Sequence, residues 1–218
     1  INYSSANTIF GVIVSIFSFV VFSLTVEPTA SYWDCAEYIS TSAKLQVGHP
    51  PGAPLFQMLG AIFSIFALEP DQIAFAVNMM SVSSSALTIL FLFWSISHLV
   101  KQIVSKNQNI SLTESFKIFG SSSLGALTFT FTDSFWYNAV EAEVYAMASL
   151  ILSLLFWLGL KWTEDLDKPR GDKWLILISF VIGLSFGVHF MGLLAIPAVG
   201  LLYYFKKYDF NLKSFLLA

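Results

Sequence analysis

The sequence predicts an all-α protein that crosses a membrane several times. Of its 218 residues, 56% are apolar and only 11% are charged, whereas a soluble domain carries roughly 25% charged and 45–50% apolar residues. Several apolar runs also approach the length of about 20 residues that a helix needs to span a bilayer. These observations exclude an ordinary cytosolic globular protein.

Charge and cysteine content exclude other classes. The formal net charge is −3 and no basic patch occurs, which argues against a disordered chain and against nucleic-acid binding. The single cysteine, Cys35, excludes a disulfide framework and a Cys-rich metal site. The chain begins with Ile1 rather than Met and ends in an apolar stretch, 214–218, that resembles the start of another span. We therefore expect it to be the N-terminal part of a longer chain.

Six apolar runs are expected to cross the membrane. They lie at about 7–26, 72–100, 118–136, 144–160, 174–189 and 192–205. A further run, Leu55–Leu68, is too short for a span and suits a helix that lies along or dips into the membrane.

The basic residues support this count. If Leu55–Leu68 does not cross, every Lys and Arg except Lys44 falls on one side of the membrane, as the positive-inside rule favours. The expected organisation is one transmembrane module with an outer loop at 27–71, which carries juxtamembrane helices at 31–47 and 54–68.

The first of these helices places two carboxylates side by side. Asp34 and Glu37 are three residues apart and share a stripe with Lys44, as residues at this spacing do on a helix. The helix could simply lie at the membrane surface with its acids in water. Alternatively, one acid is a general base beside a cleft, because a carboxylate near lipid and near a second carboxylate has a raised pKa that suits proton abstraction.

Two more groups of polar residues are expected on the same side. The turn between the third and fourth spans contains Glu141 and Glu143, which would point in nearly opposite directions on a regular helix. His189 lies at the outer end of the fifth span. These residues either face water at the membrane surface or contribute to a common site. No phosphate-binding glycine loop, nucleophile elbow or His-x-x-x-His pair occurs.

Four stretches together resemble glycosyltransferase family 117, the protein O-mannosyltransferase-like family formerly listed as a domain of unknown function. They are Trp33-Asp34-Cys35-Ala36-Glu37, the segment from Leu45 to Leu55 with Gly48-His49-Pro50-Pro51-Gly52, the segment from Trp136 to Tyr145, and Gly183 to His189. The resemblance implies a transmembrane bundle like that of the GT-C superfamily. It also implies transfer of a sugar, with mannose one candidate, from a polyprenyl-phosphate donor to Ser or Thr hydroxyls of exported proteins.

The resemblance further implies roles for individual residues. Asp34 is the expected catalytic base, and Glu37 is expected to orient the acceptor or tune Asp34. The expected substrate-binding residues are Lys44, His49, Trp136, Glu141, Glu143, Tyr145 and His189. No metal ligands are assigned and no cofactor is expected besides the lipid-linked sugar; a divalent metal is compatible with the sequence but not indicated by it.

The expected partners are membrane lipid, a lipid-phosphate sugar donor and a protein acceptor, and nucleic acid is not among them. The composition favours the bacterial inner membrane, with the active site on the periplasmic face. Two alternatives remain: an ion-coupled transporter and a non-catalytic membrane subunit. Transporters usually place their charges near the membrane midplane, whereas here the acids gather at one surface.

Overall fold

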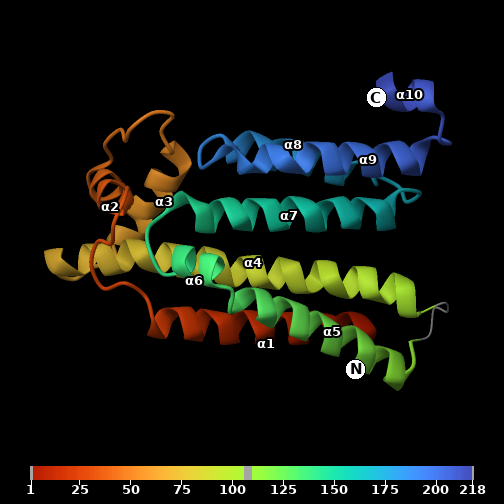
Figure 1. The fold of residues 1–218 in the computed structure, drawn as a ribbon, viewed down its shortest axis with the longest axis horizontal. Helices are drawn as coiled ribbons and strands as arrows, with labels where there is room; N and C mark the ends of the chain where they lie inside the picture. Colours follow the sequence, from red (N-terminus) through yellow and green to blue (C-terminus); the bar gives the residue numbers. More distant parts are fainter. Residues whose placement is uncertain (1, 106–109, 218) are drawn as a thin grey trace.

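The computed structural model describes residues 2–105 and 110–217, and every regular element within them is a helix (Figure 1). The α-helices are α1 Tyr3–Leu24, α2 Cys35–Lys44, α3 Pro54–Ser64, α4 Ile73–Val104, α5 Leu112–Thr130, α6 Asp133–Ala139, α7 Val144–Asp165, α8 Lys173–Ser185, α9 Ala195–Lys207 and α10 Leu212–Leu217; η1 Pro70–Gln72 and η2 Phe190–Leu194 are 3-10 helices. The prediction of an all-α membrane protein is confirmed.

The long helices run along one axis, and α2 and α3 lie together at one end of the bundle (Figure 1). The last turn of α1 and the first turn of α4 lie at this same end. The short helix α3 stays at this end and does not run the length of the bundle (Figure 1). The central helix, α4, packs against α1, α5 and α7. Buried apolar residues form two clusters, one containing Phe22, Phe93 and Ile118 and the other containing Phe56 and Leu155.

Four helical segments of the described residues are long and apolar enough to cross a membrane: Tyr3–Leu24, Pro70–Val104, Val144–Asp165 and Phe190–Lys207. The runs expected at 118–136 and 174–189 correspond to α5 with part of α6, and to the shorter apolar helix α8. Which helices cross the membrane stays a prediction. In the stretch 214–218, α10 extends to Leu217, and Ala218 lies outside the described residues, as does Ile1.

Helix ends differ from the expected ranges for local reasons. Leu45 adopts a left-handed conformation (φ 49°, ψ 48°) and ends α2, with its N–H directed at the carbonyls of Ser42 and Thr41. The run expected at 118–136 is interrupted after Thr130, and α6 begins at Asp133. A carboxylate in the first turn suits a helix start because it faces the positive end of the helix dipole.

Backbone hydrogen bonds fix α3 and the loop before α2 to other parts of the chain. The N–H groups of Leu55 and Phe56 donate to the Gly187 carbonyl at 2.8 and 3.2 Å, and the Glu27 N–H donates to the Val140 carbonyl at 2.9 Å. A Cβ on Gly187 would lie 2.8 Å from the Leu55 Cβ, so only glycine permits this approach. The segment near residue 27 therefore lies against that near residue 140, and the start of α3 lies against the segment near residue 187.

Candidate functional site

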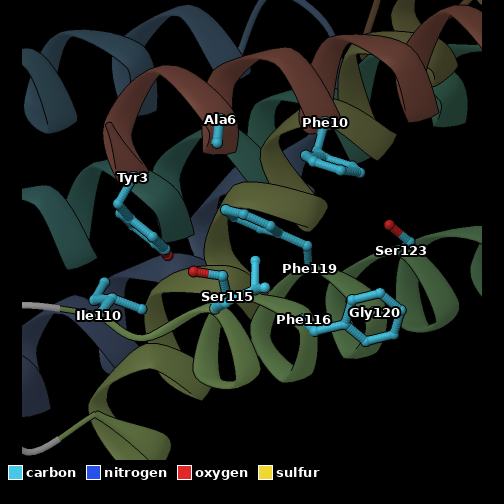
Figure 2. A pocket seen from close by; sticks show the side chains of 10 residues that line it. Tyr3, Ala6, Phe10, Ile110, Ser115, Phe116, Phe119, Gly120 and Ser123 are labelled. Atoms are coloured by element: carbon cyan, nitrogen blue, oxygen red, sulfur yellow. The ribbon is translucent and has the colours of Figure 1, made fainter. Parts of the chain in front are cut away.

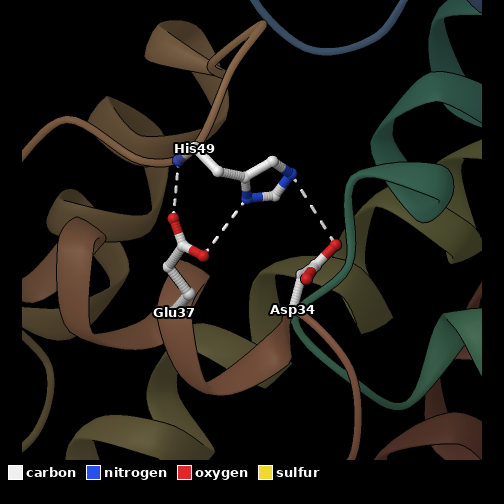
Figure 3. A group of neighbouring side chains, drawn as sticks. All are labelled: Asp34, Glu37 and His49. Atoms are coloured by element: carbon white, nitrogen blue, oxygen red, sulfur yellow. Dashed lines mark hydrogen bonds and ion pairs between the residues drawn. The ribbon is translucent and has the colours of Figure 1, made fainter.

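Two carboxylates and a histidine meet at the start of α2 (Figure 3). The backbone N–H of His49 donates to Glu37 Oε1 at 2.6 Å, and His49 Nδ1 lies 3.2 Å from Glu37 Oε2. On the other side of the ring, His49 Nε2 lies 3.7 Å from Asp34 Oδ2. One imidazole thus bridges the two acids that the helical spacing places side by side.

The loop before His49 is held against α2 and α3 by Gln57. The buried Gln57 amide lies 3.1 Å from the Thr41 hydroxyl. Its oxygen accepts a hydrogen bond from the Gly48 N–H at 3.1 Å, and its nitrogen donates to the Gln46 carbonyl at 3.2 Å. A Cβ on Gly48 would lie 2.6 Å from the nearer atom of the Gln57 amide and 3.2 Å from Glu37 Oε1. Gly48 therefore allows the loop to bring His49 close to Glu37.

The two acids of α2 have different surroundings. The hydrogen bond from the His49 backbone N–H, reinforced by its side chain, lowers the pKa of Glu37. The expectation that pairing raises carboxylate pKa values on this helix is wrong for Glu37, because hydrogen bonds to the charged form outweigh burial. The Asp34 side chain makes no capping bond to α2 and is 55% exposed, so one of its faces remains accessible.

The carboxyl groups of this end of the bundle whose pKa is raised are those of Glu141 and Glu143, just before α7. Burial, followed by the nearby charges of Asp34 and Glu141, raises the pKa of Glu143 to about 7. Glu141 is also buried, its carboxylate accepts a hydrogen bond from the Ser31 hydroxyl, and burial raises its pKa. The Glu143 N–H bonds to the Glu141 carbonyl at 2.8 Å. This irregular turn allows both side chains to be buried, so the interpretation as a solvated acidic turn is wrong for these two residues.

Tyr38 lies beside the ring of His49 and close enough to Glu143 for the charge of that residue to act on its pKa. Its ring is buried and lies 5.8 Å from the His49 ring. Burial, followed by the charge of Glu143, raises the pKa of Tyr38 to about 12.

The Tyr145 ring lies 5.2 Å from the ring of His189. His189 Nδ1 accepts the Met191 N–H at 3.2 Å, so its ring proton is on Nε2, where it can be donated.

The sequence-based prediction missed Tyr38. It lies four residues after Asp34, and residues at that spacing share a helix face, so the signal was present. Ser31, which bonds Glu141, precedes the helix and gave no periodic signal.

Two expected substrate-binding residues lie apart from this group. The Trp136 indole donates to the Thr25 hydroxyl at 3.1 Å and packs against Phe22 and Phe131, at the end of α1. Lys44 is exposed in the last turn of α2, and within the described ranges it forms no ion pair. Their assigned roles stay predictions.

The donor set could also hold a cation. One atom each from Asp34, Glu37 and His49 lies within 4.8 Å of the others. Two carboxylate oxygens and an imidazole nitrogen are ligands that several divalent transition metals accept. Here, however, each imidazole nitrogen faces a carboxylate, which is an arrangement suited to a hydrogen-bonded histidine.

Comparison with known proteins places the chain in a family. Residues 34–212 match the model of the Protein O-mannosyl-transferase TMEM260 N-terminal domain. The chain belongs to this family. Its match begins at Asp34 and includes the bridging histidine, the acidic turn and His189.

Two curated relatives carry the same family name. The chain is 28% identical over 190 residues to the protein O-mannosyl-transferase tmem260 of Dictyostelium discoideum, with 82% of this chain covered. It is 27% identical over 168 residues to the protein O-mannosyl-transferase TMEM260 of Mus musculus, with 76% covered. The matched region spans only 21% of each relative. No solved structure matches the chain.

Proposed function

We propose that this chain carries the acceptor-activating site of a membrane-bound protein O-mannosyltransferase. Its donor is a mannosyl polyprenyl or dolichyl phosphate, and its acceptor is a Ser or Thr hydroxyl of an exported protein. Family membership supports the reaction, and the cluster of Asp34, Glu37 and His49 at one end of a membrane bundle supports the location. We place this end on the extracytoplasmic face; a bacterial inner membrane stays a prediction.

The observation that carries the proposal is the difference between the two carboxylates of α2. Both Glu37 oxygens face His49, whereas Asp34 is half-exposed. Asp34 is therefore the group that an acceptor hydroxyl can approach. It takes the hydroxyl proton as the acceptor oxygen attacks the anomeric carbon, and the bond from that carbon to the lipid phosphate breaks. Glu37 holds His49, which in turn positions Asp34.

An apolar cavity supports a donor with a lipid tail. It has a volume of about 520 Å³, lies between α4, α5, α7 and α9, and is lined by Leu92, Phe156 and Met191 among others. Met191 is two residues after His189, whose Nε2–H can donate to the donor phosphate. Such a donor near the developing negative charge of a leaving group stabilises the transition state.

The test is transfer of mannose from a lipid-phosphate donor to a Ser/Thr peptide, using the whole protein in proteoliposomes. Asp34→Asn is expected to lower the rate roughly 100-fold or more, as loss of a general base does. Glu69→Gln removes an exposed acid from the same loop and is the matched control. Full activity of Asp34→Asn, with correct insertion, would remove Asp34 from the mechanism. Solute uptake without transfer would instead support a transporter.

A further inference from the structure

A polar cavity lies beside the start of α1. The start of α1 is at the end of the bundle opposite α2 and α3 (Figure 1). The cavity has a volume of about 260 Å³ and is bounded by α1, α4 and α7. Its lining includes two lysines, a histidine and a glutamate, namely Lys101, Lys161, His98 and Glu164, together with Trp94 and Trp157. No step of the proposed transfer reaction uses these residues.

The charges of this cavity do not cancel. The Glu164 carboxylate binds the Lys161 ammonium and lies 3.0 Å from His98 Nδ1. The Gln102 amide nitrogen lies 2.7 Å from His98 Nε2. Glu164 and Lys161 therefore neutralise each other.

Lys101 supplies the remaining positive charge. Its ammonium lies 4.8 Å from the centre of the Tyr3 ring, and within residues 2–105 and 110–217 it forms no ion pair. A cation over an aromatic face keeps its N–H donors available for another partner. The cavity thus presents one uncompensated ammonium group.

An apolar groove begins on the other side of Tyr3. Figure 2 shows this pocket between α1 and α5, with Phe10, Phe116 and Phe119 around it. Its volume is about 430 Å³. The Tyr3 ring stacks on Phe119 at 5.4 Å and lines both the groove and the polar cavity. A positively charged cavity and an apolar groove therefore adjoin at one side chain.

We propose that this end of the bundle binds an anionic glycerophospholipid, with its phosphate beside Lys101 and one acyl chain in the groove between α1 and α5. The charge of Lys101 favours an anionic headgroup, and the groove favours a ligand that carries an acyl chain. Basic pockets between membrane helices bind anionic headgroups on the side where basic loops gather. Trp94 and Trp157 are of the type that lies at headgroup level. The inference is independent of the proposed transfer reaction.

The experiment is native mass spectrometry of the delipidated whole protein, titrated with phosphatidylglycerol or with phosphatidylcholine. We expect phosphatidylglycerol to bind more tightly. Lys101→Gln should weaken that binding about fivefold, as expected for one lysine beside an anionic headgroup. The matched control, Lys207→Gln, removes an exposed lysine near the end of α9 and should leave the affinity unchanged.

A second variant tests the groove. A Cβ on Gly120 meets nothing within 4 Å, so Gly120→Leu should fill the pocket without disturbing the helix and should weaken phosphatidylglycerol binding. Inorganic phosphate at millimolar concentration should displace the lipid poorly. The proposal is overturned if Lys101→Gln and Lys207→Gln weaken binding equally, if both lipids bind alike, or if Gly120→Leu has no effect and phosphate displaces the lipid.

Discussion

His49 is the residue on which the candidate site depends. Its backbone N–H and ring bind Glu37, and its second ring nitrogen faces Asp34. The bonds to Glu37 lower the pKa of that carboxyl, so Glu37 stays ionised at neutral pH and holds the ring in place.

Replacing His49 by alanine tests this positioning. The variant keeps the backbone bond but removes both ring contacts, so we expect mannosyl transfer to fall roughly 10-fold, less than the loss on removing the base itself. His49→Asn, which can still donate toward Glu37, should recover part of the rate. If His49→Ala transfers at the normal rate, the bridge has no part in catalysis.

Glu143 provides a prediction about pH. Its folded-state pKa of about 7 lies above the ordinary value of 4.5, so between these values the folded protein binds the proton more tightly than the unfolded chain. The protonated Glu143 carboxyl therefore contributes to the stability of the folded protein at low pH. This contribution declines as the pH rises from 4.5 toward 7, where the buried carboxyl ionises.

Glu143→Gln removes this dependence. We expect the variant to gain stability relative to the unmodified protein progressively from pH 4.5 to pH 7, by a few degrees in melting temperature in detergent. Glu114→Gln is the control, because Glu114 is a half-buried acid in a capping box and its pKa is lowered by hydrogen bonds from Ser111 rather than raised. If the difference in melting temperature between the Glu143 variant and the unmodified protein is the same at every pH in this range, Glu143 does not have a raised pKa.

At the scale of elements, the attachment of α3 to the end of α8 positions the site. The Gly187 carbonyl accepts two N–H groups from the first turn of α3, which otherwise have no partner within the helix. Gly187→Val should clash with Leu55 and destabilise the protein by about 1–3 kcal/mol, as overpacking does.

The matched control is Gly183→Ala in α8, where a Cβ meets nothing within 4 Å. That change should be neutral or slightly stabilising, because alanine favours a helix more than glycine does. The two variants are compared by thermal unfolding and by mannosyl transfer. Equal behaviour of both would contradict a positioning role for Gly187.

The helices were predictable from apolar runs because burial and membrane length both require continuous hydrophobic segments. The neighbourhood of Asp34 and Glu37 followed from helical spacing alone. The burial of Glu141 and Glu143 did not, because an irregular turn has no period. Nor did spacing predict that His49 would bridge the acids, since this depends on the packing of Gln57 against the loop.

At the scale of the whole molecule, α2 and α3 share one end of the bundle, whereas Lys207 ends α9 at the other (Figure 1). Single cysteines in a Cys35→Ala background test how this arrangement sits in a membrane, since the native thiol is buried. Tyr32→Cys and Glu69→Cys should react with an impermeant thiol reagent from one side, and Lys207→Cys from the other.

The comparison between Tyr32→Cys and Glu69→Cys is the decisive one, because these exposed positions flank α2 and α3. Labelling from opposite sides would mean that α3 crosses the bilayer. In that case the proposed acceptor site would lose its common face.

The bond between α3 and Gly187 also has a consequence for biosynthesis. The carboxylates of α2 are translated early, but the carbonyl that fixes α3 is added only when α8 is nearly finished. A nascent polypeptide still short of that glycine would contain Asp34 without the support that orients its surroundings. The proposed mannosyl transfer would then become possible only late in synthesis, after most of this bundle has left the ribosome.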